Sequence, residues 1–259
     1  MSRYFLEFCF KGTNYSGWQK QRNAASVQQI LDGALQTILN KETVTTGCCR
    51  TDAGVHAAQM FAHFDSEKKI SAFKFIHQLN GIMPPDISIL NLFPVDKSAH
   101  ARFDATLRTY RYFAFRKKNP FLKDYAAAFY FDLNIEMINR ACKALMEYDD
   151  FKSFAKNKTD VKDTICKIKE AKWEFEKELH CFTISSNRFL RGMVRAIAGT
   201  LIKVGKEEIN ISQFRKIIEG KSRSDAGASV PAHGLYLWGV DYKFITTKIP
   251  VNLFGKDCD

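Results

Sequence analysis

The sequence predicts an α+β protein made of two consecutive halves, each with strands and helices in the order β-α-β-β-α-β. The chain has 259 residues, of which 46% are hydrophobic and 26% charged, so it can bury a core large enough for one or two domains. Apolar residues alternate in some segments and recur at helical spacing in others. This order of segments occurs once in residues 1–104 and again in residues 105–259, which defines the two expected domains.

In the first half, the clearest signals are an alternating apolar segment at 4–10 and a helix start at Ser26. Ser26 and Gln29 form the sequence pattern of a capping box, and apolar residues follow at helical spacing as far as Ile38. The expected elements of this half are strands at 4–10, 43–49, 60–64 and 87–95 and helices at 27–38 and 71–79.

In the second half, Asn134 is expected to cap a helix that runs to about residue 148. The segments 149–163 and 206–232 are polar insertions, and the latter contains a short helix at 212–219. The remaining expected elements are a strand at 109–115, a hairpin of 164–175 and 180–185, a helix at 189–204 and a closing strand at 235–242. Both halves are therefore expected to be ferredoxin-like, each with an antiparallel sheet and helices on its outer face.

The chain shows no sign of membrane insertion or export, so a cytoplasmic protein is expected. Its longest apolar run, 125–131, is far shorter than a membrane-spanning helix, and the first residues lack a signal-peptide pattern. The seven cysteines contain no CxxC pair, and Cys48 and Cys49 are expected to pack as small side chains. The six histidines show no ligand spacing, so no metal site is expected.

Positive charge is concentrated in three segments. Lysine and arginine exceed aspartate and glutamate by 39 to 28, a net charge of +11, and residues 11–23, 105–118 and 185–206 contain no acid. All three segments also contain aromatic residues, a combination typical of nucleic-acid surfaces. The alternative is a basic surface that is merely solvated.

The segment Cys49-Arg50-Thr51-Asp52-Ala53-Gly54-Val55-His56 is a candidate site because it lies between two expected strands. An aspartate just before a small residue and a glycine is most often a turn former. Arg50 is close enough to contact a phosphate, and Gly54 allows a ligand near the backbone. Both readings of Asp52, turn former and functional carboxylate, stay open from local sequence.

A second candidate is Arg195, which lies in an otherwise apolar stretch at 193–202 of the expected helix 189–204. A guanidinium in such a place calls for an anionic partner. Arg188, Arg191 and Arg195 recur at i, i+3 and i+7, so they are expected to share one helix face. The alternative for Arg188 and Arg191 is a solvated basic stripe.

Five blocks of the sequence together resemble the TruA family of tRNA pseudouridine synthases. They are GTNYSGWQKQ followed by SVQQIL, then CRTDAGVHA, RTYRYF at 108–113, NRFLRGMVRAIAGTLIKVG at 187–205 and PAHGLYLWGVDY at 231–242. The family pattern has glycine where this chain has Cys49. Tyr15, Trp18 and Gln19 match the first block and are expected to be loop scaffold with a possible RNA contact.

The resemblance implies that uridine is isomerised to pseudouridine in the anticodon stem-loop of tRNA, at positions 38, 39 and 40, without a cofactor. Asp52 would be the catalytic aspartate, acting as a nucleophile on ribose or base, or as a proton acceptor. Arg195 would pair with it across a central cleft between the two halves. The resemblance also implies a homodimer.

The other implied site residues belong to substrate binding. Tyr110 would be the active-site tyrosine, stacking on the uracil and assisting proton removal from C5. Leu235 would close the pocket over the base, and Arg50 would occupy the space left by the flipped nucleotide. From local sequence alone, the commoner readings of these residues are a core tyrosine, a core leucine and a surface arginine.

Two other functions compete with this one. A non-catalytic RNA-binding protein needs only the basic and aromatic surfaces. A nucleotide- or methyl-donor-dependent transferase needs a glycine-rich loop between the first strand and a helix, and Gly12 and Gly17 lack that spacing. The presence of Asp52, Tyr110 and Arg195 together favours the enzyme.

Overall fold

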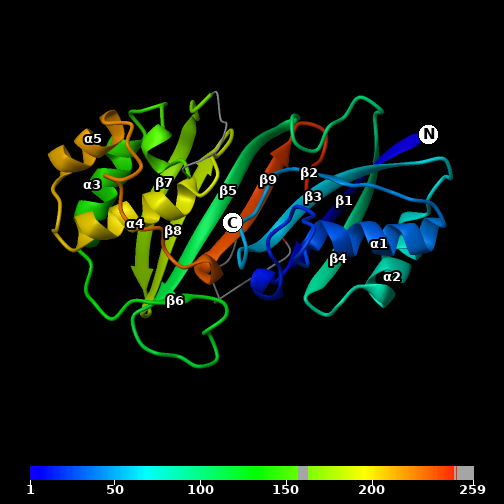
Figure 1. Ribbon diagram of the computed structural model, residues 1–259, viewed down its shortest axis with the longest axis horizontal. Helices are drawn as coiled ribbons and strands as arrows, with labels where there is room; N and C mark the ends of the chain where they lie inside the picture. Colours follow the sequence, from blue (N-terminus) through cyan, green and yellow to red (C-terminus); the bar gives the residue numbers. More distant parts are fainter. Residues whose placement is uncertain (157–162, 248, 250–259) are drawn as a thin grey trace. The chain divides into compact units, whose positions relative to one another are not determined.

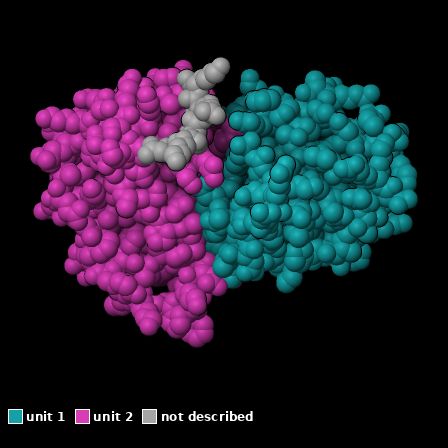
Figure 2. Space-filling model, viewed as in Figure 1, with its two compact units in different colours: residues 1–106, 237–259 teal, residues 107–236 magenta. Residues whose placement is uncertain are grey.

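The computed structural model describes residues 1–156, 163–247 and 249, and they form the predicted α+β structure. The chain divides into two compact units (Figure 2). Unit 1 contains Met1–Thr106 and the described residues after Tyr236, and unit 2 contains Leu107–Tyr236. The chain passes from unit 1 to unit 2 within one strand and returns within another.

The strands of unit 1 are ordered β4-β1-β3-β9, with β2 paired to β3. Both neighbours of β1 run antiparallel to it. Ten of the eleven residues of β3 are buried, and other strands of this unit pair with both of its edges. The bounds are β1 (Ser2–Phe10), β2 (Thr46–Gly47), β3 (His56–Ser66), β4 (Ile87–Val95) and β9 (Leu235–Tyr242, in this unit from Leu237).

Two α helices of unit 1 lie alongside its strands (Figure 1). In α1 (Val27–Leu39) the Ser26 hydroxyl accepts a hydrogen bond from the Gln29 amide at 3.3 Å, so the predicted N-cap is confirmed. Val27, Leu31 and Leu35 form its buried stripe. The other elements of this unit are α2 (Ala72–Ile82), which packs on β4, and a 3-10 turn η1 (Gly12–Asn14).

Unit 2 has the strand order β5-β8-β7, and both pairs are antiparallel. A short strand β6 pairs parallel to β5, which makes the whole set of strands mixed. Every residue of the central strand β8 is buried. The bounds are β5 (Ala105–Phe115), β6 (Ala127–Ala128), β7 (Ile168–Glu176) and β8 (Leu179–Ser186).

Helices and 3-10 turns complete unit 2. Asn134 caps the first helix by accepting a hydrogen bond from the Met137 amide at 3.1 Å, as predicted. Within the described part of the chain, no helix is long and apolar enough to cross a membrane. The elements are α3 (Ile135–Leu145), α4 (Met193–Gly205), α5 (Ile211–Glu219), η2 (Lys152–Phe154) and η3 (Ala232–Gly234).

Helix α4 begins four residues later than predicted. Gly192 precedes it with φ of 74°, a left-handed conformation in which the chain turns sharply before the first helical residue, Met193. Arg188 and Arg191 therefore lie before the helix. The expectation that they share a helix face with Arg195 is wrong.

The observed units differ from the predicted domains in where β9 belongs. The change between units falls at Thr106/Leu107, close to the expected 104/105, but the chain from Leu237 groups with unit 1. The physical reason is packing: the Tyr242 ring lies against Phe5 and Phe61 with centroids 5.4 and 5.2 Å apart. The Val240 amide also donates to Gln59 Oε1 at 3.0 Å.

His63 on β3 is a buried histidine whose imidazole must stay neutral in the folded protein. Its Nδ1 accepts a hydrogen bond from the Ala101 amide at 3.1 Å. Burial, aided by the positive charge of Arg3 and by His100, lowers the pKa of His63 to about 4. Protonation of Nδ1 would break the bond to Ala101.

We predict that unfolding becomes easier as the pH falls from 6.5 to 4. In that range the unfolded chain binds a proton at residue 63 that the folded chain does not, so the free energy of unfolding decreases. His63→Asn keeps an acceptor near the Nδ1 position and should remove roughly 1–3 kcal/mol of this pH dependence. Thermal melts of both proteins at several pH values measure it, and parallel curves would contradict the assignment.

Candidate active site

Asp52 lies in the loop that leads into β3, and its residue is half-buried. The Asp52 carbonyl accepts a hydrogen bond from the Val55 amide at 3.2 Å, which closes a tight turn. Gly54 has φ of 76°, a conformation that a side chain rarely adopts. The turn reading and the functional reading of Asp52 are thus compatible, because the turn holds its backbone in place.

Two glycines of the first block allow another loop to pack directly on the backbone of this turn. A Cβ on Gly12 would lie 1.9 Å from the Val55 carbonyl oxygen, and one on Gly17 would lie 2.2 Å from that of Thr51. Gly17 also has φ of 89°. Residues 12–17 and 51–55 therefore touch backbone to backbone, in a contact that only glycine permits.

Hydrogen bonds join the two loops where the glycines meet them. The Trp18 amide donates to the Thr51 carbonyl at 3.3 Å, and the Gly54 amide donates to the Tyr15 carbonyl at 3.2 Å. The Gly12 amide donates to Nδ1 of His56 at 2.9 Å. The Asp52 turn is thus held along both sides by the loop before α1.

Tyr15 and Trp18 anchor this loop and are themselves buried. The Tyr15 hydroxyl donates a short hydrogen bond to Asp86, and burial together with that carboxylate raises the pKa of Tyr15. The Trp18 ring packs on Phe8, with centroids 5.7 Å apart. Their role as scaffold is confirmed, whereas Gln19 is exposed and a contact of this block with RNA stays a prediction.

The residues just before Asp52 differ in exposure. Arg50 is exposed, so its side chain is available to a ligand. Cys48 is buried and Cys49 half-buried, with their sulfur atoms 3.8 Å apart, in keeping with small packing residues. The loop keeps the turn at Asp52 although Cys49 stands where the family pattern has glycine.

Tyr110 lies on β5 in unit 2, opposite Ile184 of β8, and only 6% of it is exposed. The Phe189 ring meets it edge to face at a centroid distance of 5.2 Å. Arg108 on the same strand face is also buried and donates to the Asn187 carbonyl at 2.6 Å. Tyr110 therefore sits beside a positively charged side chain, at the rim of the unit's core.

Arg195 lies in the first turn of α4 and is half-buried. Its Nε donates to the Val230 carbonyl at 2.7 Å, and the Val230 amide donates back to the Arg195 carbonyl at 3.2 Å. This reciprocal pair fixes the guanidinium on the segment that precedes η3. The guanidinium also acts electrostatically on the buried Tyr112 and on His233, so both side chains lie near it.

Arg195 acts electrostatically on two titratable side chains of unit 2. Burial raises the pKa of Tyr112, against the opposing effect of Arg195. Burial lowers the pKa of His233, and the positive charge of Arg195 lowers it further, while Asp124 acts in the opposite direction. Both side chains therefore stay neutral at pH 7, which leaves Arg195 as the cation of this group.

The remaining predicted residues of unit 2 are spread over three kinds of position. Leu235 is buried at the start of β9, directly after η3. Arg188 is half-buried and forms an ion pair with Asp163 at 2.6 Å, whereas Arg191 is exposed. The three arginines therefore do not form one basic stripe. Arg188 is in an ion pair, Arg191 is exposed, and Arg195 lies in helix α4.

The candidate residues form two groups: Arg50 and Asp52 in unit 1, and Tyr110, Arg195 and Leu235 in unit 2. The first group offers a carboxylate on a rigid turn, and the second offers an aromatic ring, a fixed guanidinium and an apolar side chain. No cluster of three or more histidine, cysteine, aspartate or glutamate side chains suited to a metal ion occurs in the described ranges.

Sequence reasoning missed the residues that support these groups. The spacing of Gly12 and Gly17 does not fit a nucleotide-binding loop. Two glycines that flank an aromatic residue can also signal close backbone contact, and that contact was not predicted from the sequence. Asp86 follows the Pro84–Pro85 pair and gave no signal of its own. The Val230 carbonyl is a backbone group, which no side-chain pattern reveals.

Comparison with known proteins shows the family to which the chain belongs. A family model described as tRNA pseudouridine synthase matches residues 141–243. Proteins named tRNA pseudouridine synthase A are similar over most of the chain. The protein from Bacteroides thetaiotaomicron is 47% identical over 99% of this chain and 94% of its own length.

More distant relatives carry the same name. The protein from Bacillus subtilis is 38% identical over 90% of this chain and 96% of its own length. The protein from Caldicellulosiruptor bescii is 36% identical over 93% of this chain and 100% of its own length. This chain belongs to the tRNA pseudouridine synthase A family, and the family expected from the sequence blocks is confirmed.

We predict that Gly17→Ala destabilises the protein by roughly 2–4 kcal/mol, because the added Cβ meets the Thr51 carbonyl in a left-handed conformation. Gly33→Ala is the matched control, since Gly33 is an exposed residue of α1 with no atom near its Cβ position. That variant should be unchanged or more stable by about 0.5–1 kcal/mol. Urea unfolding of the two variants compares them; equal midpoints would exclude the backbone contact.

Proposed function

We propose that this chain isomerises uridine to pseudouridine in tRNA, at positions 38, 39 and 40 of the anticodon stem-loop. The observation that carries the proposal is 47% identity, over nearly the whole chain, to a protein named tRNA pseudouridine synthase A. The net charge of +11 suits a polyanionic substrate. The anticodon stem-loop is inferred from the resemblance of the sequence blocks.

In the proposed reaction the N-glycosidic bond of the uridine breaks, the uracil turns, and its C5 forms the new bond to the ribose. The proton on C5 is then lost and N1, released from the ribose, takes up a proton, so the product is an isomer and no redox partner is consumed. We assign Asp52 as the catalytic carboxylate, either as nucleophile or as proton acceptor. Its turn is held by the glycine contacts, which preorganises the carboxylate before substrate binds.

We assign Arg195 as the cation that keeps Asp52 ionised. In this proposal the two halves are ferredoxin-like, meet around a central cleft and bring the two side chains together there. A guanidinium carries five N–H donors, so Arg195 can donate to the Val230 carbonyl through Nε and to a carboxylate through its other nitrogens. A carboxylate shielded from water requires such a partner to remain charged.

Tyr110 is assigned to stack on the uracil and to assist removal of the C5 proton, and Leu235 to close the pocket over the base. Arg50 would occupy the space left by the flipped nucleotide, in keeping with its exposure. Arg191 would contact RNA phosphates, and Arg188 would do so in exchange for its ion pair with Asp163. We further propose a cytoplasmic homodimer that needs no cofactor.

The function is tested by release of tritium from C5-labelled uridine in tRNA, followed by mapping of pseudouridine in the product. We predict that Asp52→Asn lowers the rate by at least about 10³-fold, while tRNA affinity stays within a few-fold because phosphates dominate binding. Asp149→Asn, at an exposed aspartate of unit 2, is the control and should match the wild type. Tritium release equal in wild type and Asp52→Asn would leave the RNA-binding alternative.

The pairing of Asp52 with Arg195 is tested by a double-mutant cycle in unfolding free energy. Arg195→Met alone should cost roughly 3–5 kcal/mol, because it leaves a shielded carboxylate without its cation. When Asp52→Asn is already present, the same change should cost less by about 1 kcal/mol or more. Loss of the Val230 hydrogen bond is common to both steps and cancels, so additive costs would mean that the two residues do not interact.

A further inference from the structure

Two cysteines lie side by side just before the turn that carries Asp52. Cys48 and Cys49 are both in the thiol state, and their sulfur atoms are 3.8 Å apart, with the Cys48 thiol donating to the Cys49 sulfur. The family pattern has glycine where this chain has Cys49, so the pair belongs to this chain and not to that pattern. The proposed mechanism uses neither thiol.

The backbone brings both sulfur atoms to the same side of the chain. In a strand, consecutive side chains point to opposite faces. Strand β2 ends at Gly47, however, and the chain bends at Cys48 and Cys49. The bend makes two consecutive thiols neighbours, which a regular strand does not allow.

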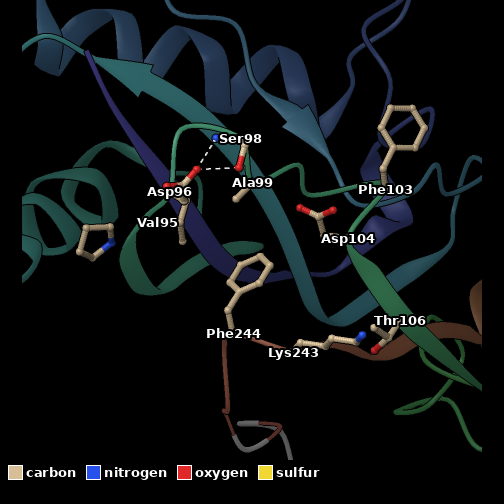
Figure 3. Close-up of a pocket in the computed structure, with 10 residues that line it drawn as sticks. Val95, Asp96, Ser98, Ala99, Phe103, Asp104, Thr106, Lys243 and Phe244 are labelled. Atoms are coloured by element: carbon tan, nitrogen blue, oxygen red, sulfur yellow. Dashed lines mark hydrogen bonds between the residues drawn. The ribbon is translucent and has the colours of Figure 1, made fainter.

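The two thiols differ in their access to solvent. Cys48 is fully buried, whereas Cys49 is half-buried. A groove of about 680 Å³ elsewhere on unit 1 has other walls: Figure 3 shows that they come from within residues 94–106 and from Lys243 and Phe244. A small oxidant therefore meets the pair at the sulfur of Cys49, and Cys48 is the thiol held behind it.

Three other cysteines are poor targets for oxidation. Burial raises the pKa of the Cys9 thiol, and it raises the pKa of Cys166 to about 11 and that of Cys142 to about 12. The thiolate is the form of cysteine that attacks an oxidant. These three thiols therefore stay protonated at pH 7 and react slowly.

We propose that Cys48 and Cys49 form a redox-active dithiol, which a hydroperoxide converts to a disulfide that slows the enzyme. Formation of the disulfide depends only on the two thiols, whereas its effect on turnover rests on the proposed function. In a reducing compartment, the disulfides that do form are mostly transient and catalytic or redox-sensing. A pair of thiols already in contact is suited to that use, because no large motion has to precede the bond.

The reaction has two balanced steps. The Cys49 sulfur gives up its proton and attacks one oxygen of hydrogen peroxide; the O–O bond breaks, hydroxide leaves and takes up that proton as water, and Cys49 becomes a sulfenic acid. The Cys48 sulfur then attacks the Cys49 sulfur, so that the S–S bond forms, the S–O bond breaks, and a second water leaves with the Cys48 proton. The two thiols lose two electrons, which reduce one peroxide to two waters.

Closing the disulfide must move the backbone. The sulfur atoms approach from 3.8 Å to about 2.0 Å, in a ring that includes the peptide between the two residues. The chain before this ring is held by β3. Gly47 pairs with Ala62, and the Cys48 amide donates to the Phe61 carbonyl at 2.8 Å. The change in backbone angles therefore falls on Cys49 and on the residues that follow it.

The residues that follow the pair are those of the candidate site. The Trp18 amide donates to the Thr51 carbonyl at 3.3 Å, so the chain is held again two residues beyond Cys49. Arg50 lies between the ring and this hydrogen bond and must absorb much of the change. The proposed function places the Arg50 side chain in the space left by the flipped nucleotide, and Asp52 comes directly after Thr51. Oxidation should therefore disturb how the substrate is held at the catalytic carboxylate.

The first experiment treats the reduced protein with hydrogen peroxide and measures the tryptic peptide of residues 42–50, which contains both cysteines. We expect its mass to fall by about 2 Da, because two hydrogen atoms are lost, and dithiothreitol to reverse the change. An unchanged peptide, oxygen added to Cys49 without a disulfide, or a disulfide between two chains overturns the proposal.

The second experiment measures turnover of tRNA before and after peroxide. Oxidised wild type should lose roughly 10- to 100-fold in kcat/KM, and dithiothreitol should restore it. Cys49→Gly, which introduces the residue of the family pattern, and the nearly isosteric Cys49→Ser should match untreated wild type and resist peroxide. Cys9→Ala is the matched control, since it removes another half-buried thiol of unit 1 but keeps the pair, and it should stay sensitive.

Two results of the second experiment contradict the proposal. One is oxidised wild type that carries the disulfide but turns over tRNA at the untreated rate, and the other is a Cys49 variant as sensitive to peroxide as wild type. Failure of the proposed function is distinguishable, because fully reduced wild type would then form no pseudouridine in any tRNA. The mass of the peptide 42–50 would still report whether the disulfide forms.

Discussion

The backbone contact between residues 12–17 and 51–55 is the constraint on which the candidate site depends. Carbonyl oxygens of Thr51 and Val55 occupy the places where Gly17 and Gly12 would otherwise carry side chains. Because the backbones touch, the amides and carbonyls of the two loops can bond directly, as those of Trp18 and Thr51 do. These contacts therefore hold the turn that presents Asp52, although it has no regular secondary structure of its own.

Periodicity and capping signals were enough to predict the order of nearly all elements. The strand at 87–95 was predicted to the residue, and Ser26 and Asn134 cap helices as their positions indicated. These successes share a cause, since alternation and N-caps act between residues close in sequence. The prediction of α4 fails at Gly192, whose left-handed backbone makes the helix begin later than expected. Arginines at helical spacing therefore extend into a segment before the helix that is not helical.

The sequence predicts the residues of the candidate site but not the contacts that support them. Asp52, Tyr110 and Arg195 are predicted from blocks of sequence that resemble the family, and membership of that family is established. The contacts that hold them are made by backbone atoms, such as the Val230 carbonyl, or by residues distant in sequence, such as Asp86. Contacts of this kind produce no periodic pattern in the sequence. The grouping of β9 with unit 1 could not be predicted for the same reason, because it depends on packing of Tyr242 against Phe5 and Phe61.

The return of the chain in β9 has a consequence for folding during synthesis. Unit 1 is interrupted by the whole of unit 2, so β3 lacks its β9 neighbour until residues 107–236 have left the ribosome. Until then the most buried strand of unit 1 has an open edge, the kind of edge that pairs with other chains. Synthesis at about 5–20 residues per second makes this interval roughly 7 to 26 seconds long. Unit 2, whose residues are continuous, can complete its fold before unit 1 receives β9.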